Sequence, residues 1–179
     1  MIAFGLYRGN AFMRPDLCLM EQLDNQVSDF LRELGIAVMR TQGATEHYNV
    51  TTYHGASGPF INVVRPKAES NFYVIAMNVA LHRSHQDKMR TMSSQERERS
   101  LNQIKYMLLS MNVDFAFLPQ GSDVPTNVQL EKILYAGPDC FLQNFFESYT
   151  LVRNAGLLVI TKLMEEFGPV EPEAQPGYM

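Results

Sequence analysis

Two histidines and an aspartate lie close together in the stretch LHRSHQDKMRTMSSQERERS, residues 81–100. His82 and His85 are three residues apart, so a helix would place both imidazoles on one face, and Asp87 could add a carboxylate. These groups are zinc ligands, but a closed site would need further ligands, which the neighbouring sequence does not supply at a known spacing. The sequence therefore predicts no structural metal here. His82, His85 and Asp87 are the first residues to test for any ligand.

Basic residues in the same stretch could form a nucleic-acid patch, but they alternate with acids. The basic residues are Arg83, Lys88, Arg90, Arg97 and Arg99, and the acids are Asp87, Glu96 and Glu98. Glu96 and Arg99 have a spacing that pairs charges on one helix face. The net charge of −4 also differs from the basic balance of most nucleic-acid-binding domains. The stretch is therefore predicted to be the capped, charged entry of a solvated helix, and nucleic acid is not expected as a partner.

No catalytic or phosphate-binding motif is complete in the sequence. The segment HGASGP, residues 54–59, resembles the G-x-S-x-G nucleophile elbow, but its second glycine comes one position early. Ser57 is therefore interpreted as a turn residue. There is no G-x-G-x-x-G or P-loop string, and no predicted acid lies opposite the adjacent Glu165 and Glu166. We expect neither a catalytic residue nor a cofactor from these patterns.

The composition is that of one globular domain. Of the 179 residues, 46% are hydrophobic and 19% are charged. No apolar run approaches the roughly 20 residues that cross a bilayer, and the N-terminus lacks the regions of a signal peptide. Cys18 and Cys140 match no metal or redox spacing, as expected for thiols in a reducing cytosol. We therefore expect a cytoplasmic protein that does not associate with membranes.

Hydrophobic periodicity predicts a helix near the start of the chain and a run of β-strands after it. The helix is expected from Pro15 to Leu34, with Gly35 as its terminator. Four segments rich in β-branched and aromatic residues then predict an antiparallel meander, at residues 36–42, 47–53, 59–65 and 71–81. The last of them, NFYVIAMNVAL, is apolar on nearly both faces, which favours a central place in the sheet. Ser93 and Glu96 have capping-box spacing and predict the start of a second helix.

A second strand pair and a long helix complete the predicted fold. The strands are expected at 113–120 and 127–136, and the helix runs from Pro138 to Phe167, before Gly168. The order α-β-β-β-β-α-β-β-α indicates an α+β fold with helices packed on an antiparallel sheet. We expect one domain at residues 15–168, an N-terminal extension at 1–14 and a disordered Pro/Glu-rich tail at 169–179.

The last predicted helix carries more apolar surface than one face of a sheet can cover. Phe145, Tyr149 and Val152 form a stripe at helical spacing, and other apolar residues add a second flank. A central core helix explains this pattern, and so does a helix that meets another subunit. Because two-fold dimers are the commonest way to cover such a surface, we expect a homodimer, with these three residues as the candidate interaction surface.

Two long segments resemble an uncharacterised, largely archaeal family of small proteins. They are FINVVRPKAESNFYVIAMNVALHRSHQDKM and ILYAGPDCFLQNFFESYTLVRNAGLLVI, and the likeness covers residues 16–165. The family is similar to the type III secretion chaperone-like fold, also found in YbjN-like proteins. The resemblance implies a compact α+β domain that dimerises and binds protein segments, and it carries over no catalytic residue. One departure is YAGPDC, residues 135–140, where such proteins often have an acidic residue and Gly-Leu.

Three functional hypotheses follow. We expect a non-enzymatic, chaperone-like protein-interaction module, although the sequence does not name its protein partner. The alternative is a small-molecule-binding protein or enzyme with a pocket between the sheet and the helices, for which His82, His85 and Asp87 would be tested first. The third hypothesis is nucleic-acid binding through the arginines of the second helix. Convergent polar groups in a deep pocket would favour the alternative, and a basic stripe facing one way would favour the third.

Overall fold

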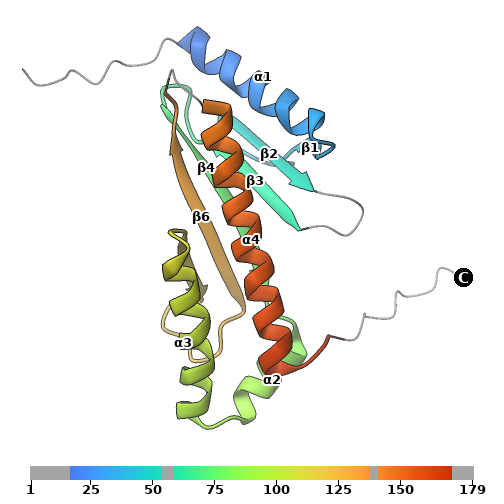
Figure 1. Cartoon of the computed structure of the whole chain (residues 1–179), viewed down its shortest axis with the longest axis vertical. Coiled ribbons are helices and arrows are strands. Elements are labelled where there is room, and N and C mark those ends of the chain that lie inside the picture. The colour runs from blue at the N-terminus through green and yellow to red at the C-terminus, as the bar shows by residue number, and fades with distance from the viewer. Residues whose placement is uncertain (1–16, 54–58, 138–140, 171–179) are drawn as a thin grey trace, which may run out of the picture.

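The computed structural model describes residues 17–53, 59–137 and 141–170 and forms four helices and six strands (Figure 1). In chain order they are α1 (Leu17–Glu33), β1 (Ala37–Arg40), β2 (Tyr48–Tyr53), β3 (Phe60–Arg65), β4 (Phe72–Ala80), α2 (Arg83–Thr91), α3 (Ser94–Ser110), β5 (Asp114–Leu118), β6 (Asn127–Tyr135) and α4 (Phe141–Phe167). The predicted α+β fold and element order are confirmed, with one additional short helix, α2. The expected extension at 1–14, residues 171–179 of the expected tail, Cys140, the side chain of Cys18 and residues 54–58 lie outside the described residues.

The strands form one antiparallel sheet in the order β1-β2-β3-β4-β6-β5. The predicted meander of the first four strands is confirmed, because each pairs with the next along the chain. β4 lies centrally between β3 and β6, as its apolar sequence predicts, and pairs with β6 from Phe72↔Tyr135 to Ala80↔Asn127. β6 is also an interior strand, since β5 pairs with it as far as Glu131. Within the described sheet, residues 132–135 of β6 have β4 on one side but no strand on the other.

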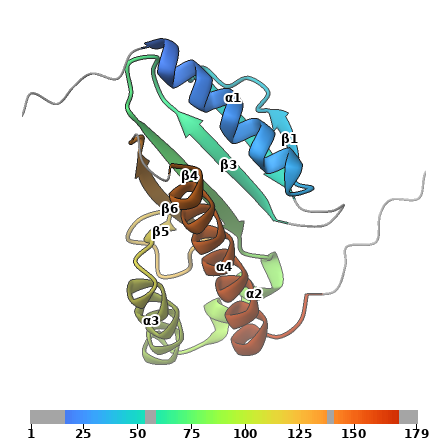
Figure 2. The ribbon, with the colours of Figure 1, turned by 45° about the horizontal axis from the view of Figure 1, so that its top comes forward.

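Helices α1 and α4 lie on the same face of the sheet (Figure 2). α4 packs against β4 and β6, and α1 contacts β1. Alternate strand residues point to this face because side chains along a strand alternate between its two sides. Ile61 and Val63 of β3 and Ile75 and Met77 of β4 are all 4% exposed or less. The hydrophobic core therefore lies between the helices and this one face.

Helix α4 packs closely on the sheet at Gly156. A Cβ atom added there would lie 2.2 Å from Sδ and 2.4 Å from Cε of Met77 on β4. Glycine inside a helix usually lowers its stability, and here the contact with Met77 gives a packing reason for it. Although α4 has 27 residues, neither it nor any other helix among the described residues has the length and apolar content that crossing a membrane requires.

The segment between β4 and β5 contains two helices where the sequence predicted one with a lead-in. α2 begins after His82, whose Nδ1 accepts a hydrogen bond from the Ser84 N–H at 3.2 Å. The predicted start of the next helix, α3, is confirmed. Ser93 Oγ accepts a hydrogen bond from the Glu96 N–H at 3.3 Å, and Glu96 Oε2 accepts one from the Ser93 N–H at 3.1 Å. Arg97 Nη1 donates to the Met89 carbonyl at 3.0 Å and so joins the two helices.

Replacing Ser93 by alanine should lower the free energy of unfolding by about 1 kcal/mol, because the Glu96 N–H loses its acceptor. Urea denaturation monitored by circular dichroism measures the change. Ser94→Ala is the matched control, since Ser94 is the exposed first residue of α3 and alanine favours helices. Equal midpoints for Ser93→Ala and the wild type would contradict the cap assignment.

Candidate functional site

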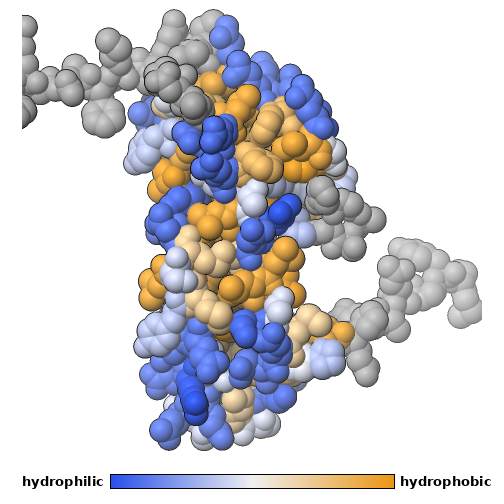
Figure 3. Space-filling model, in the orientation of Figure 1, coloured by the Kyte–Doolittle hydropathy of each residue, from blue (hydrophilic) through white to orange (hydrophobic). Residues whose placement is uncertain are grey.

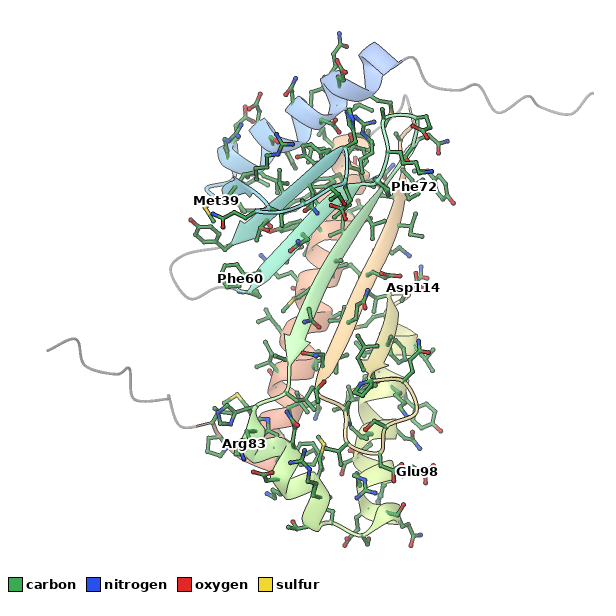
Figure 4. The ribbon with its side chains drawn as sticks, turned by 180° about the vertical axis from the view of Figure 1, so that it is seen from behind. Met39, Phe60, Phe72, Arg83, Glu98 and Asp114 are labelled. Atoms are coloured by element: carbon green, nitrogen blue, oxygen red, sulfur yellow. The ribbon has the colours of Figure 1, made fainter. Side chains whose placement is uncertain are left out.

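The second face of the sheet is covered by none of the described helices (Figure 4). We term it the open face. It carries the strand residues that alternate with the core positions, and in β4 these are Phe72, Val74, Ala76, Asn78 and Ala80. All of them are half-buried or exposed, whereas the residues between them are buried. A solvated sheet face is normally polar, but this one carries two groups of apolar side chains.

The first group lies where β3, β4 and β6 adjoin, and we term it the β4–β6 cluster: Val64, Phe72, Val74, Ile133 and Tyr135. The strand register places Val74 between Val64 and Ile133, and it places Phe72 beside Tyr135. The Phe72 and Tyr135 ring centroids are 6.0 Å apart. Ile133 is 43% exposed and Tyr135 is 65% exposed. Cross-strand contacts therefore hold these side chains together without removing them from water.

The second group is the β1–β3 cluster: Met39, Tyr53 and Phe60. Tyr53 and Phe60 lie directly opposite each other on β2 and β3, with ring centroids 5.9 Å apart. The Tyr53 hydroxyl donates to Met39 Sδ at 3.9 Å. Met39 is 52% exposed and Phe60 is 63% exposed. Figure 4 labels Met39 and Phe60 on one side of the open face and Phe72 on the other, so the two clusters are separate.

A mainly polar row crosses the sheet from β2 to β5, and on β1 it meets Met39, which lies opposite Thr51. The register aligns Thr51, Asn62, Ala76, Glu131 and Asp114 in neighbouring positions from β2 to β5. The two carboxylates stand at the β5 end of this row, away from the β1–β3 cluster. The open face therefore has two apolar areas with a polar strip between them.

The three residues expected to form an interaction surface on the last helix lie in the core instead. Phe145 and Val152 are 0% exposed and Tyr149 is 3% exposed. The Tyr149 hydroxyl is 2.7 Å from Thr52 Oγ1 on β2, and burial raises the pKa of this phenol. This corrects the expectation of an exposed contact at these positions, because α4 turns this stripe toward the sheet. The same spacing also allowed a core helix, and that is its role here.

His82, His85 and Asp87 are close in sequence but do not converge on a common point. The ring centroids of the two histidines are 6.3 Å apart. His85 is 4% exposed, and its Nε2–H donates to the Gly168 carbonyl at 2.8 Å, which ties α2 to the end of α4. The exposed Asp87 accepts from Arg90 Nη1 at 2.5 Å. Within the parts of the chain that the structure describes, no three His, Cys, Asp or Glu residues are grouped to hold a metal.

A cavity of about 320 Å³ lies between α3 and the loop that joins β5 to β6. Its lining consists of Ser94, Arg97, Glu98, Leu101, Lys105, Phe117, Gly121, Ser122 and Asp123. Arg97 Nη2 is 3.2 Å from Asp123 Oδ2, and Lys105 Nζ lies 5.6 Å from the Phe117 ring centroid. The lining thus combines two bases with two acids, so their charges balance. The predicted residues His82, His85 and Asp87 are not part of it.

A buried arginine ties α1 to the sheet. Arg65, at the end of β3, is 0% exposed. Its Nε–H donates to Asp24 Oδ1 at 3.0 Å, and its Nη2 donates to Asp24 Oδ2. Its Nη1 donates to the carbonyls of Lys67 at 3.2 Å and Ala68 at 2.6 Å. The Tyr73 hydroxyl donates to Asp24 Oδ1 at 2.7 Å, so one carboxylate accepts from both β3 and β4.

This cluster contains the residue types of an acid–base site, but its geometry indicates a structural role. Burial and the hydrogen bond to Asp24 raise the pKa of Tyr73, and burial raises the pKa of the neighbouring Tyr48 to about 12. Neither phenol therefore ionises near neutral pH. The Asp24 carboxylate and the Arg65 guanidinium form hydrogen bonds with each other. Their further hydrogen bonds go to the Tyr73 hydroxyl and to the Ala68 carbonyl. We conclude that the cluster fixes α1 on the sheet.

Residues 23–163 match a family described as "Uncharacterized conserved protein (DUF2299)". The chain belongs to this family. No curated protein matches the sequence. One similar solved structure is described as "Crystal structure of an uncharacterized protein from Methanothermobacter thermautotrophicus". It is 18% identical with a TM-score of 0.72, and the match covers 81% of this chain and 99% of that one. At this identity the likeness shows the fold alone.

The family match includes every residue of both open-face clusters, none of which was predicted from the sequence as part of a site. A signal for them exists in β6. On its open-face side this strand begins with Asn127, Gln129 and Glu131 and ends with Ile133 and Tyr135. The apolar residues at the end interrupt a polar alternation, and such an interruption on a solvated face indicates a contact surface.

Proposed function

We propose that this protein is a non-enzymatic protein-interaction module that forms a homodimer through the open face of its sheet. The observation that carries the proposal is the presence of two exposed apolar clusters on a face that no described helix covers. Large apolar side chains grouped on one face of a soluble protein are typical of contact surfaces. Ile133, Tyr135, Met39 and Phe60 supply most of this exposed apolar surface.

The arrangement of the clusters favours a second copy of the chain as the partner. A two-fold axis in the plane of contact, midway between the clusters, would place the β4–β6 cluster of one chain on the β1–β3 cluster of the other. The reciprocal contact would form at the same time, as in any isologous dimer. Sheets packed face to face lie about 10 Å apart, a gap that aromatic side chains from both sides can fill.

A chaperone-like role and a cytoplasmic location complete the proposal. The chaperone-like role is supported by the family resemblance, which implies binding of protein segments by a dimeric α+β domain. The cytoplasmic location is supported by the two cysteines, which have no disulfide or metal spacing.

Small-molecule binding is a second candidate function. It is favoured by the cavity between α3 and the β5–β6 loop, whose lining includes the charged residues Arg97, Lys105, Glu98 and Asp123. A ligand with both a positive and a negative group would match these charges. Because the bases and acids of the cavity can also pair with each other, this candidate ranks below the open face.

The dimer predicts a particle of twice the 20.4 kDa chain mass at micromolar concentration in sedimentation velocity. Tyr135→Lys should weaken dimerisation about tenfold or more, because it replaces an exposed aromatic contact by a charge in each of the two copies of the interface. The monomer should remain folded, since Tyr135 is 65% exposed.

Tyr106→Lys is the matched control for this experiment. Tyr106 is 69% exposed but belongs to α3, outside the open face, so its replacement should leave the dimer intact. A wild-type chain that remains monomeric at its highest soluble concentration would contradict the proposal. Equal weakening by Tyr106→Lys and Tyr135→Lys would show that the open face is not the interface.

A further inference from the structure

A second apolar surface runs along one side of α4, on the helix-bearing side of the molecule, where Figure 3 shows hydrophobic residues at the surface. We term it the α4 flank: Leu142, Phe146, Thr150, Arg153, Leu157, Ile160 and Met164. These spacings of four and three residues keep the side chains within roughly 80° of one another around the helix. Phe146 is 41% exposed although its ring lies 6.0 Å from that of Phe30 on α1, and Leu157 and Met164 are each 44% exposed. The solvent side of a helix is normally polar, so this flank needs an explanation.

Arg153 lies at the middle of the flank, and its charge is unpaired within the described residues. The Nε–H is buried and has no hydrogen-bond acceptor among them. None of the ion pairs between described residues includes Arg153. Thr150, three residues earlier on the same flank, has a buried Oγ1 that also lacks a partner. A guanidinium without a counter-charge in its own chain can take one from an acidic group of a bound partner.

We propose that the α4 flank binds an amphipathic helix of another protein, and that a carboxylate of that helix pairs with Arg153. Beyond the contact of Phe146 with Phe30 of α1, the flank extends about 21 Å from Thr150 to Met164 at the usual rise of a helix, which suits a helix of similar length lying alongside. Spacings of three and four residues form the ridges into which side chains of a second helix pack. A carboxylate is the expected complement of Arg153 because it matches the planar guanidinium through two hydrogen bonds.

A second copy of α4 would match the apolar positions of the flank but not its charge. If two α4 helices pair antiparallel with Leu142 opposite Met164, Arg153 of each chain falls opposite Arg153 of the other. Parallel pairing in register brings the same two residues together. Like charges at the centre of a partly buried contact oppose association, so the charge pattern favours a different, acidic helix. The flank and the open face lie on opposite sides of the sheet, and this inference does not depend on the proposed dimer.

Two synthetic peptides can test the charge preference directly. Each peptide is a helix with leucines at the spacing of the flank, and the central residue is glutamate in one and lysine in the other. Fluorescence anisotropy with the full chain should show that the glutamate peptide binds about tenfold more tightly or better. Arg153→Glu should reverse this order, and Arg153→Gln should abolish the preference. Leu157→Asp should weaken binding of both peptides.

Arg99→Glu provides the control, because Arg99 is an exposed residue of α3 and its replacement should leave the preference unchanged. Equal binding of the two peptides by the wild type would overturn the proposal. So would a glutamate preference that persists in Arg153→Gln. If Leu157→Asp converts a dimer into a monomer, the flank binds a second copy and the proposal fails. If Tyr135→Lys does not affect dimerisation, the proposed open-face dimer is contradicted, but the proposal for the α4 flank is not.

Discussion

Replacing Val152 by glutamate should prevent the chain from folding. Val152 is 0% exposed on the side of α4 that packs against the sheet. A carboxylate forced into that position without a partner should cost about 4 kcal/mol or more. The whole stability of a domain is only about 5–15 kcal/mol. Circular dichroism and a thermal melt should therefore show loss of the cooperative transition, or a midpoint far below that of the wild type.

Leu157→Glu is the matched control for this prediction. It introduces the same residue on the same helix, but Leu157 is 44% exposed, so the stability should change by less than about 1 kcal/mol. The comparison separates burial from helix propensity, because glutamate replaces an aliphatic residue in both variants. A cooperatively folded Val152→Glu chain would mean that Val152 lies at the surface, as the original interaction hypothesis required.

The strands and most helices could be predicted because their signals are local. β4 is apolar on nearly both faces, which indicates a central strand, and Ser93 with Glu96 marks a helix start directly. α2 was not predicted as a separate helix because it lacks such local signals. It has nine residues, only His85 and Met89 of them buried, and its cap is a histidine, which is not a usual N-cap residue.

The side of α4 that faces the sheet could not be read from hydrophobicity. The stripe through Phe145 and Val152 and the flank through Phe146 and Leu157 are both mainly apolar and both have helical spacing, although the flank also holds Thr150 and Arg153. The choice depends on contacts with strands far away in the sequence. Gly156 was the available signal, because it shares the first stripe, and a residue without a side chain permits close approach to the sheet.

The buried ionic cluster could not be predicted at all. Arg65 follows the apolar run of β3, where a basic residue is normally expected to reach solvent. Its partner Asp24 lies 41 residues earlier on a helix with several other polar residues. No local pattern connects the two, since their contact exists only once α1 lies on the sheet. The candidate site shared this difficulty, because the open face is defined by the absence of a helix over it.

Replacing Asp24 by alanine should lower the free energy of unfolding by about 3–5 kcal/mol, because it leaves a buried guanidinium without its counter-charge. Arg65 is 0% exposed, and two of its nitrogens and the Tyr73 hydroxyl donate to the Asp24 carboxylate. Urea denaturation measures the loss, and an unchanged slope would show that the native and unfolded states keep their compactness. Tyr73→Phe removes one of these hydrogen bonds and should cost about 1 kcal/mol.

Asp29→Ala is the matched control on the same helix. Asp29 accepts from Arg32 at 2.8 Å, but both side chains are largely exposed, so its loss should cost less than about 1 kcal/mol. Replacing Asp24 by leucine and Arg65 by methionine together should recover much of the stability that Asp24→Ala loses, because no buried charge then remains unpaired. If Asp24→Ala costs no more than Asp29→Ala, the guanidinium must reach water in solution. α1 would then be held on the sheet by its apolar contacts alone.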